Sequence, residues 1–126
     1  MRIAIKRAYE EAAAGDGCRV LVDRVWPRGR SREELALADW AKELGPSTAL
    51  RQWFGHDPQR WAEFRERYRQ ELAAPEQRAR LQALLDAAGA GPLTLVYGAK
   101  DGQHNQAVVL RELLEHANAP ERIDRL

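Results

Sequence analysis

Leu93-Thr94-Leu95-Val96-Tyr97 is the stretch of sequence that decides the fold. Four of its five side chains are apolar or aromatic, and polar and apolar positions do not alternate. A strand that is apolar on both faces is typical of a parallel sheet covered by other elements on each side. A second such run, Val20-Leu21-Val22, lies within a strand predicted over residues 18–23. The two runs together predict an α/β fold.

The rest of the chain supplies one more strand and a series of helices. Residues 2–9 alternate, with Ile3 and Ile5 on one face, which predicts a first strand. Apolar periodicity and capping residues predict helices over residues 31–44, 47–54, 58–72, 75–88 and 105–117. The expected architecture is a small, mostly parallel sheet of three or four strands with about five helices. It includes a long, all-helical insertion between the second and third strands.

Length and composition limit the class of protein. A chain of 126 residues is expected to form one domain over residues 1–126. Its 20 basic and 19 acidic residues give a net charge of +1, which argues against a global attraction to nucleic acid or to membranes. No apolar run approaches the roughly 18 residues of a membrane span, and the first residues lack the apolar region of a signal peptide. We therefore expect a cytoplasmic protein without a membrane partner.

Polar side chains are concentrated where two of the predicted strands end. The first bend holds Asp23, Arg24, Trp26 and Arg28; the second holds Lys100, Asp101, His104 and Asn105. If the strands are parallel, both bends emerge at the same edge of the sheet, where open α/β sheets bind ligands. The second bend also leads into a helix, whose N-terminus favours an anion. The pattern predicts a positively charged hollow at this edge.

The residue types suggest a role for each side chain in that hollow. His104 or Asp23 would act as the acid or base. An anion would be bound by the charged side chains Arg24, Arg28 and Lys100, together with Trp26, Asp101 and Asn105. No Cys and His spacing fits zinc, and no glycine-rich nucleotide motif occurs, so neither a metal nor a cofactor is predicted.

Each of these side chains also has a purely structural interpretation. Arg24 and Arg28 are equally well explained as braces that bond a carboxylate or a backbone carbonyl. Trp26 is a natural packing anchor, and Asp23 suits a turn cap. His104 is also compatible with plain surface, and Gln103 or Asn105 with the helix cap. His56 forms a possible pair with Asp57, although Asp57 is fully explained as the N-cap before Pro58.

Several motifs resemble the YeaO-like branch of the domain-of-unknown-function 488 family. They are Arg24-Val25-Trp26-Pro27-Arg28-Gly29, Asp39-Trp40-Ala41-Lys42, Pro46-Ser47, Leu50-Arg51, Trp53-Phe54-Gly55-His56-Asp57-Pro58 with Arg60-Trp61, and Leu95-Val96-Tyr97-Gly98-Ala99-Lys100-Asp101 with His104-Asn105 and Ala107-Val108-Val109-Leu110. The resemblance covers nearly the whole chain. The family has no defined activity, and some members are described as transcriptional regulators.

The resemblance carries two further expectations. Longer relatives have a Cys-His-Arg loop where this chain has Gln103-His104-Asn105, so a cysteine nucleophile is absent at that place. The resemblance also implies that the first two strands run parallel with a shortened crossover, whereas the short connection alone leaves their direction open.

Three kinds of function follow from these observations. The favoured one is a domain that binds an anionic small molecule, a nucleotide or phosphorylated metabolite, with hydrolase or transferase activity as a further step. A nucleic-acid-binding regulator would use Arg65, Arg67 and Arg69, but acidic residues on the same helix give it a mixed face. A protein-interaction module, monomeric or homodimeric, would use the tryptophans and the tail from Asn118. Whether the chain is an enzyme is left open by the residues.

Overall fold

A four-stranded parallel sheet with β4 in an interior position forms the centre of the computed structural model, which describes residues 1–117. The strand order is β1-β4-β2-β3, and β4 pairs with both β1 and β2. The strands are β1 (Ile3–Arg7), β2 (Cys18–Leu21), β3 (Asp39–Trp40) and β4 (Leu93–Tyr97). The predicted parallel direction of the first two strands is confirmed. The tail predicted from Asn118 lies outside the described residues.

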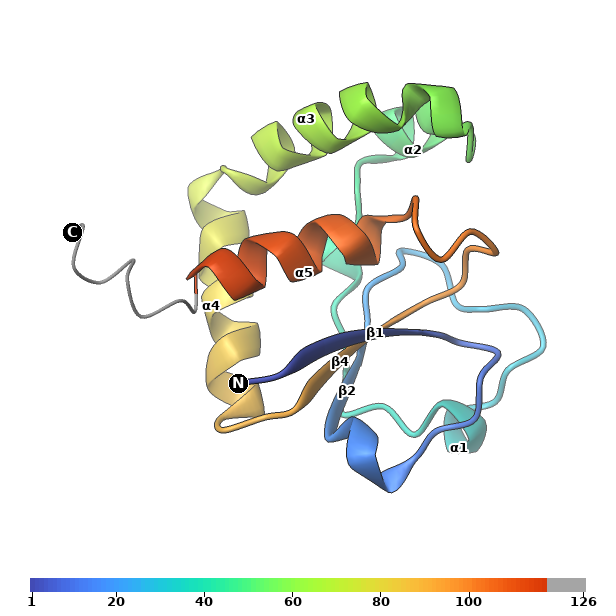
Figure 1. Cartoon of the computed structure of the whole chain (residues 1–126), viewed down its shortest axis with the longest axis vertical. Helices are drawn as coiled ribbons and strands as arrows, with labels where there is room; N and C mark the ends of the chain where they lie inside the picture. Colours follow the sequence, from blue (N-terminus) through green and yellow to red (C-terminus); the bar gives the residue numbers. More distant parts are fainter. Residues whose placement is uncertain (118–126) are drawn as a thin grey trace.

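Five α-helices and three short 3₁₀ helices accompany the sheet within residues 1–117 (Figure 1). The α-helices are α1 (Arg32–Leu35), α2 (Thr48–Phe54), α3 (Trp61–Leu72), α4 (Pro75–Ala88) and α5 (Gln106–Ala117). The 3₁₀ helices are Ala14–Asp16, Lys42–Leu44 and Pro58–Arg60. The predicted caps at Ser31, Ser47 and Asp57 are confirmed, since each side chain accepts a hydrogen bond from the first helical turn.

One predicted helix is much shorter than expected. The segment from Ser31 ends its helix at Leu35, because Ala36 adopts a left-handed φ of 46°. The chain then runs beside β2, where the Ala38 N–H bonds the Arg19 carbonyl and the Ala41 N–H bonds the Leu21 carbonyl, both at 2.8 Å. These bonds satisfy backbone groups that an open edge of β2 would leave unpaired. The segment between β2 and β4, which was predicted to be an all-helical insertion, is therefore not all helical, because it contains β3.

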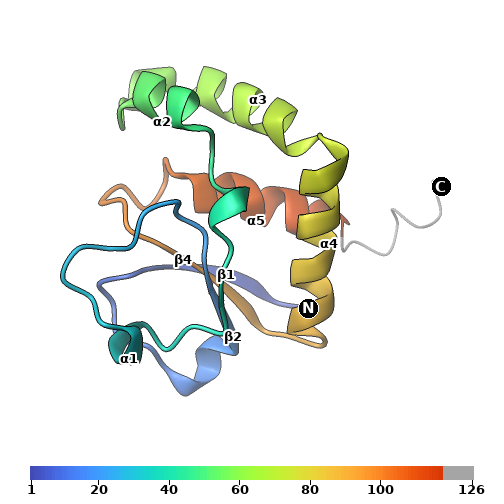
Figure 2. The same ribbon diagram turned by 180° about the vertical axis from the view of Figure 1, so that it is seen from behind.

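The two faces of the sheet are covered unequally (Figures 1 and 2). Helices α2 to α5 lie on one face, where Phe64, Tyr68 and Leu110 belong to the main apolar core. The other face is covered by α1 and the loops around it, which pack Leu35 and Ala8 against the strands. Among the helices of residues 1–117, none combines the length and the apolar character needed to cross a membrane. The main apolar core therefore lies on the face of the sheet that carries four helices.

A buried arginine closes part of the thinly covered face. Arg19 is 3% exposed, and its Nε donates to the Leu35 carbonyl at 2.8 Å. Its Nη1 lies 2.7 Å from Asp16 Oδ2, and Lys6 Nζ lies 3.2 Å from the same oxygen. The Thr94 hydroxyl bonds the Asp16 carbonyl at 2.7 Å. The short crossover between β1 and β2 is therefore tied to the sheet by charge-assisted bonds.

Gly17, at the end of that crossover, is expected to tolerate no side chain. Its φ of 65° and ψ of −129° lie in a region that L residues rarely adopt, and an added Cβ would lie 2.8 Å from Pro92 Cδ. Gly17→Ala is expected to lower the free energy of unfolding by about 1–3 kcal/mol. Urea denaturation measures this change. Gly15→Ala is the control, since open space surrounds Gly15; equal losses in the two variants would contradict the prediction.

Candidate functional site

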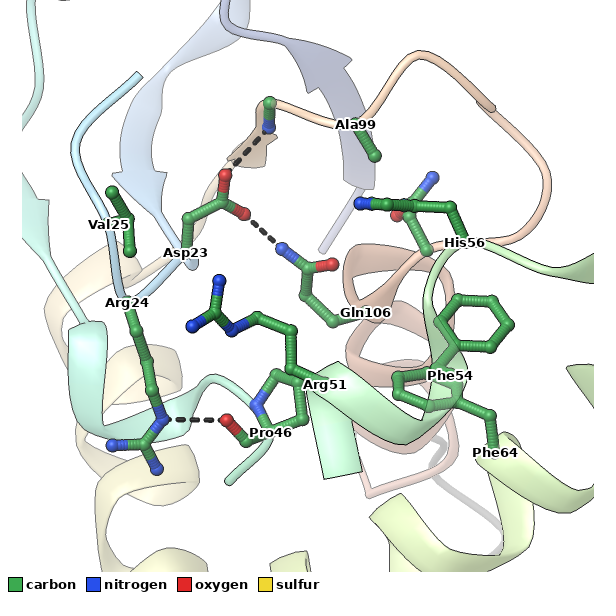
Figure 3. Close-up of a pocket in the computed structure, with 12 residues that line it drawn as sticks. Asp23, Arg24, Val25, Pro46, Arg51, Phe54, His56, Phe64, Ala99 and Gln106 are labelled. Atoms are coloured by element: carbon green, nitrogen blue, oxygen red, sulfur yellow. Dashed lines mark hydrogen bonds between the residues drawn. The ribbon is translucent and has the colours of Figure 1, made fainter. Parts of the chain in front are cut away.

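The two bends meet at the Asp23 carboxyl group (Figure 3). Asp23 follows β2, and Gly98 follows β4, the neighbouring parallel strand. The Gly98 N–H donates to Asp23 Oδ2 at 2.9 Å, and the Gln106 side-chain amide at the start of α5 donates to Asp23 Oδ1. The strand ends are therefore joined through one carboxylate, at the edge of the sheet where parallel α/β folds bind ligands.

Burial gives this carboxyl group an unusual proton affinity. Removal from water raises the pKa of Asp23 from its ordinary value of 3.8 to about 6. The Gly98 N–H and the positive charge of Arg51 oppose this rise, and they do not cancel it. A carboxyl group with a pKa near neutrality gains or loses its proton in response to small changes around it.

A cavity of about 220 Å³ opens beside Asp23. Its apolar wall is formed by Val25, Pro46, Phe54, Phe64 and Ala99. Its polar lining comes from three places in the fold: the bend after β2, helix α2 with the turn that follows it, and the start of α5. These polar residues are Asp23, Arg24, Arg51, His56, Asn105 and Gln106. The cavity is thus lined by one acidic group, by basic and amide groups, and by aromatic side chains.

The two arginines of the cavity differ in what they contact. Arg24 is held by the backbone, since its Nε lies 2.7 Å from the Pro46 carbonyl and its Nη2 lies 3.0 Å from the Gly45 carbonyl. The bracing interpretation of Arg24 is thus correct for these nitrogens. The Arg51 side chain makes no hydrogen bond or ion pair with any described residue, and Figure 3 shows its guanidinium pointing toward Asp23 and Arg24. Both arginines are exposed, and of the two Arg51 keeps all of its side-chain donors available to a ligand.

The second bend is ordered by its own polar groups. Asn105 is the N-cap of α5, because its Oδ1 accepts from the Ala107 N–H at 2.9 Å and the Val108 N–H at 3.2 Å. Asp101 Oδ2 lies 2.7 Å from Nδ1 of His104, and hydrogen bonds hold the pKa of Asp101 below its ordinary value. The His104 ring packs edge-on against Trp61, with centroids 5.2 Å apart. The pair of Asp101 and His104 lies beside the cavity and is not among its lining residues.

The remaining predicted residues lie elsewhere. Trp26 packs edge-on against Trp40 and donates its indole N–H to the Arg30 carbonyl at 2.7 Å. It borders a separate depression. Arg28 and Lys100 are exposed and do not line the cavity. Of the predicted site residues, Asp23, Arg24 and Asn105 line the cavity, and Asp101 and His104 lie next to it.

Comparison with known proteins places the chain in a family. The model of the DUF488-N3i family, described as "Inactive DUF488-N3 subclade", matches residues 2–125. The chain belongs to the DUF488 family. It is 47% identical over 114 residues to the uncharacterized protein YeaO of Escherichia coli (strain K12), covering 90% of this chain and 97% of the relative.

Other relatives of this DUF488 chain are also without a described function. The uncharacterized protein Rv3073c of Mycobacterium tuberculosis (strain ATCC 25618 / H37Rv) is 37% identical over 113 residues, which is 90% of this chain and 93% of the relative. The uncharacterized protein Mb3100c of Mycobacterium bovis has the same identity and coverage. No solved structure matches the chain. The expected resemblance to the YeaO-like branch is thus confirmed.

Reasoning from the DUF488 sequence missed Arg51 and Gln106 and left His56 open. Arg51 precedes the buried Phe54 by three positions in α2, so it flanks the face that packs on the core. His56 adopts a left-handed φ of 57°, directly after the end of α2, and lines the cavity. The available signal was the Leu50-Arg51 motif, a charged residue beside a buried one. Within residues 1–117 no cluster of His, Cys, Asp and Glu is suited to hold a metal.

Proposed function

We propose that this DUF488 chain is a binding domain for a small anionic molecule, held in the cavity beside Asp23. The observation that carries the proposal is Arg51, which lines the cavity without a protein partner among residues 1–117. A guanidinium has five donors in a planar fork and is charged at every physiological pH. Arg51 is exposed, so water bonds its donors in the free protein, and an anion in the cavity would replace that water with charge-assisted bonds.

Three features favour binding without turnover. The matching subclade is described as inactive. The family resemblance implies a cysteine in this bend of longer relatives, whereas this chain has Gln103, so a thiolate nucleophile is absent at that place. His104, one of the two candidate acid or base groups, packs against Trp61 and does not line the cavity, so Asp23 alone of the two lies there. Hydrolase or transferase activity therefore receives less support than binding.

The nucleic-acid alternative is weakened by the pairing of the arginines on α3. Arg65 Nη2 and Arg69 Nη2 lie 2.5 and 2.6 Å from Glu112 Oε2 on α5. Arg67 pairs with Glu63 on its own helix. Cations that are already paired release fewer counterions from a phosphate backbone. The arginines named for nucleic-acid binding thus act mainly between helices and along α3.

The test of the proposed function is the Arg51→Ala variant. Titration of ¹⁵N-labelled protein with small anions is expected to shift the amide resonances of Gly98 and Gln106, which border the cavity. Loss of the charge-assisted bonds is expected to weaken binding about 10- to 100-fold in Arg51→Ala. Arg51→Lys keeps the charge without the planar fork and should lie between the two.

The matched control is Arg78→Ala, which removes an exposed arginine from α4, away from the cavity lining. This variant should bind the anions as tightly as the unmodified chain. The proposal fails if acetate, benzoate, inorganic phosphate and AMP all leave the cavity resonances unchanged at millimolar concentration. It also fails if Arg51→Ala binds as well as Arg78→Ala does.

A further inference from the structure

The cavity beside Asp23 contains a single unpartnered guanidinium. Arg24 also lines the cavity, but its Nε and Nη2 are bonded to the carbonyls of Pro46 and Gly45. Among the described residues of the lining, Arg51 is thus the guanidinium with all of its donors free to bond a ligand, whereas Arg24 has only Nη1 without a partner. Arg24 keeps its positive charge, because the carbonyls that it bonds are neutral. The two arginines and an ionised Asp23 therefore give the lining a net charge of +1, which one negative charge on a ligand balances.

The start of α5 is closed to a phosphate group. Helix N-termini bind phosphate through free backbone N–H groups. Here the Asn105 side chain accepts the N–H groups of Ala107 and Val108, and it is 1% exposed. The Gln106 side-chain amide is committed to Asp23. The N–H groups of Ala107 and Val108 and the side-chain amide of Gln106 therefore already have acceptors within the protein, which leaves fewer donors for a phosphate.

Asp23 selects against a second negative charge. Its carboxyl oxygens face the cavity edge and accept from Gly98 and Gln106, so a dianion beside Arg51 would lie next to an acidic group. Like charges in a partly dehydrated site repel strongly. With a pKa of about 6, Asp23 is mostly ionised at neutral pH, and its charge repels a dianion more strongly than a monoanion.

The volume and the apolar lining of the cavity indicate the size and the polarity of the rest of the ligand. Phe54 and Phe64 border the cavity but are only 5% and 1% exposed. Val25, which is 59% exposed, and the half-buried Ala99 offer the apolar surface that a ligand can cover. The volume of about 220 Å³ exceeds the roughly 150 Å³ of a cavity that holds benzene. It is smaller than the 300 Å³ or more that encloses most drug-sized ligands. The space fits a six-membered ring with one small polar group.

We infer that the ligand is a monocarboxylic acid with an apolar, ring-sized body, whose carboxylate pairs with Arg51 while the body packs against Val25, Ala99 and the exposed edges of Phe54 and Phe64. This inference rests on the proposed function and narrows it, because a nucleotide or phosphorylated metabolite carries too much charge and volume. The apolar body supplies affinity by leaving water, and the single ion pair supplies orientation.

The test compares probes that differ in one property each. Benzoate and cyclohexanecarboxylate are expected to shift the Gly98 and Gln106 resonances. Benzamide, which has the same shape without the charge, is expected to bind at least tenfold more weakly. Inorganic phosphate and AMP, which carry more charge, are also expected to bind at least tenfold more weakly than benzoate. Arg51→Ala should reduce the affinity for benzoate to that for benzamide.

The outcomes separate the narrow inference from the proposed function. If phosphate or AMP binds through Arg51 and benzoate does not, the monocarboxylate inference is overturned and anion binding stands. If benzamide binds as tightly as benzoate, the ion pair contributes nothing and the inference is also overturned. If no anion binds, the proposed function fails and the inference fails with it. Arg78→Ala serves as the control in each titration.

Discussion

Phe64→Ala is expected to lower the free energy of unfolding by about 3–5 kcal/mol, which is the usual cost of removing a buried aromatic side chain. Phe64 is 1% exposed. Its ring lies between those of Phe54, Trp61 and Tyr68, with centroids 4.3, 5.7 and 5.5 Å away. These neighbours belong to α2 and α3, which are tied elsewhere to the core, so they cannot fully close the space left behind. A domain of this size has about 5–15 kcal/mol of stability in total, so the loss is a large part of it.

Urea denaturation followed by circular dichroism measures this loss as a lower midpoint with an unchanged slope. Phe64→Leu keeps most of the volume and should lose about half as much or less, which preserves a measurable fold if alanine does not. Tyr9→Ala is the surface control, because Tyr9 is 43% exposed, and it should change stability by less than about 1 kcal/mol. A Phe64→Ala loss no larger than that of Tyr9→Ala would contradict the predicted core.

Asp23→Asn is expected to stabilise the protein at neutral and alkaline pH. The pKa of Asp23 is raised from 3.8 to about 6 in the folded state, mainly by burial. Its contribution to stability is therefore complete below about pH 4 and is lost as the pH rises through 6. A difference of about two in pKa corresponds to about 3 kcal/mol, which the folded protein loses once Asp23 is ionised. Asparagine has no charge to bury, so the variant keeps the stability that the unmodified chain loses when Asp23 ionises.

The measurement is thermal or urea denaturation of both proteins at pH 4, 6 and 8. Asp23→Asn should be the more stable by about 2–3 kcal/mol at pH 8, and the difference should shrink toward zero at pH 4. The amide oxygen of asparagine can still accept the Gly98 N–H, and Gln106 can turn its carbonyl toward the new NH₂ group. A variant that is less stable at pH 8 would refute the raised pKa.

The elements with strong local signals were predictable from the sequence. β4 and β2 are apolar on both faces, and the starts of α1, α2 and the Pro58 helix carry capping residues. β3 was not predictable, because it is only two residues long and exists through its backbone bonds to β2. A capping box shows where a helix starts and does not show where it ends, so Ser31 and Glu34 suggested a longer helix than the chain forms.

The residues that line the cavity also include some that the sequence predicted and some that it did not. The positions of Asp23 and Asn105 in the cavity lining were predictable from local signals. Asp23 lies two residues after the end of β2, and Asn105 directly precedes α5. Arg51 was not predictable, because its role depends on where α2 packs against the carboxyl ends of β2 and β4. Trp40 was expected in a helix, whereas it lies in β3 and donates its indole N–H to the Asp23 carbonyl at 2.6 Å. Contacts between residues far apart in sequence decide both positions.

The interior position of β4 has a consequence for the order in which a newly synthesised chain can fold. β1 and β2 are made first, but neither pairs with the other, and each finds its main partner in β4. β4 begins at Leu93, about three-quarters of the way along the chain. Pairing over such long sequence separations is slow, because the connecting loop must lose its freedom before the contacts form. The pairing of β1 and β2 into one sheet therefore waits until β4 has left the ribosome.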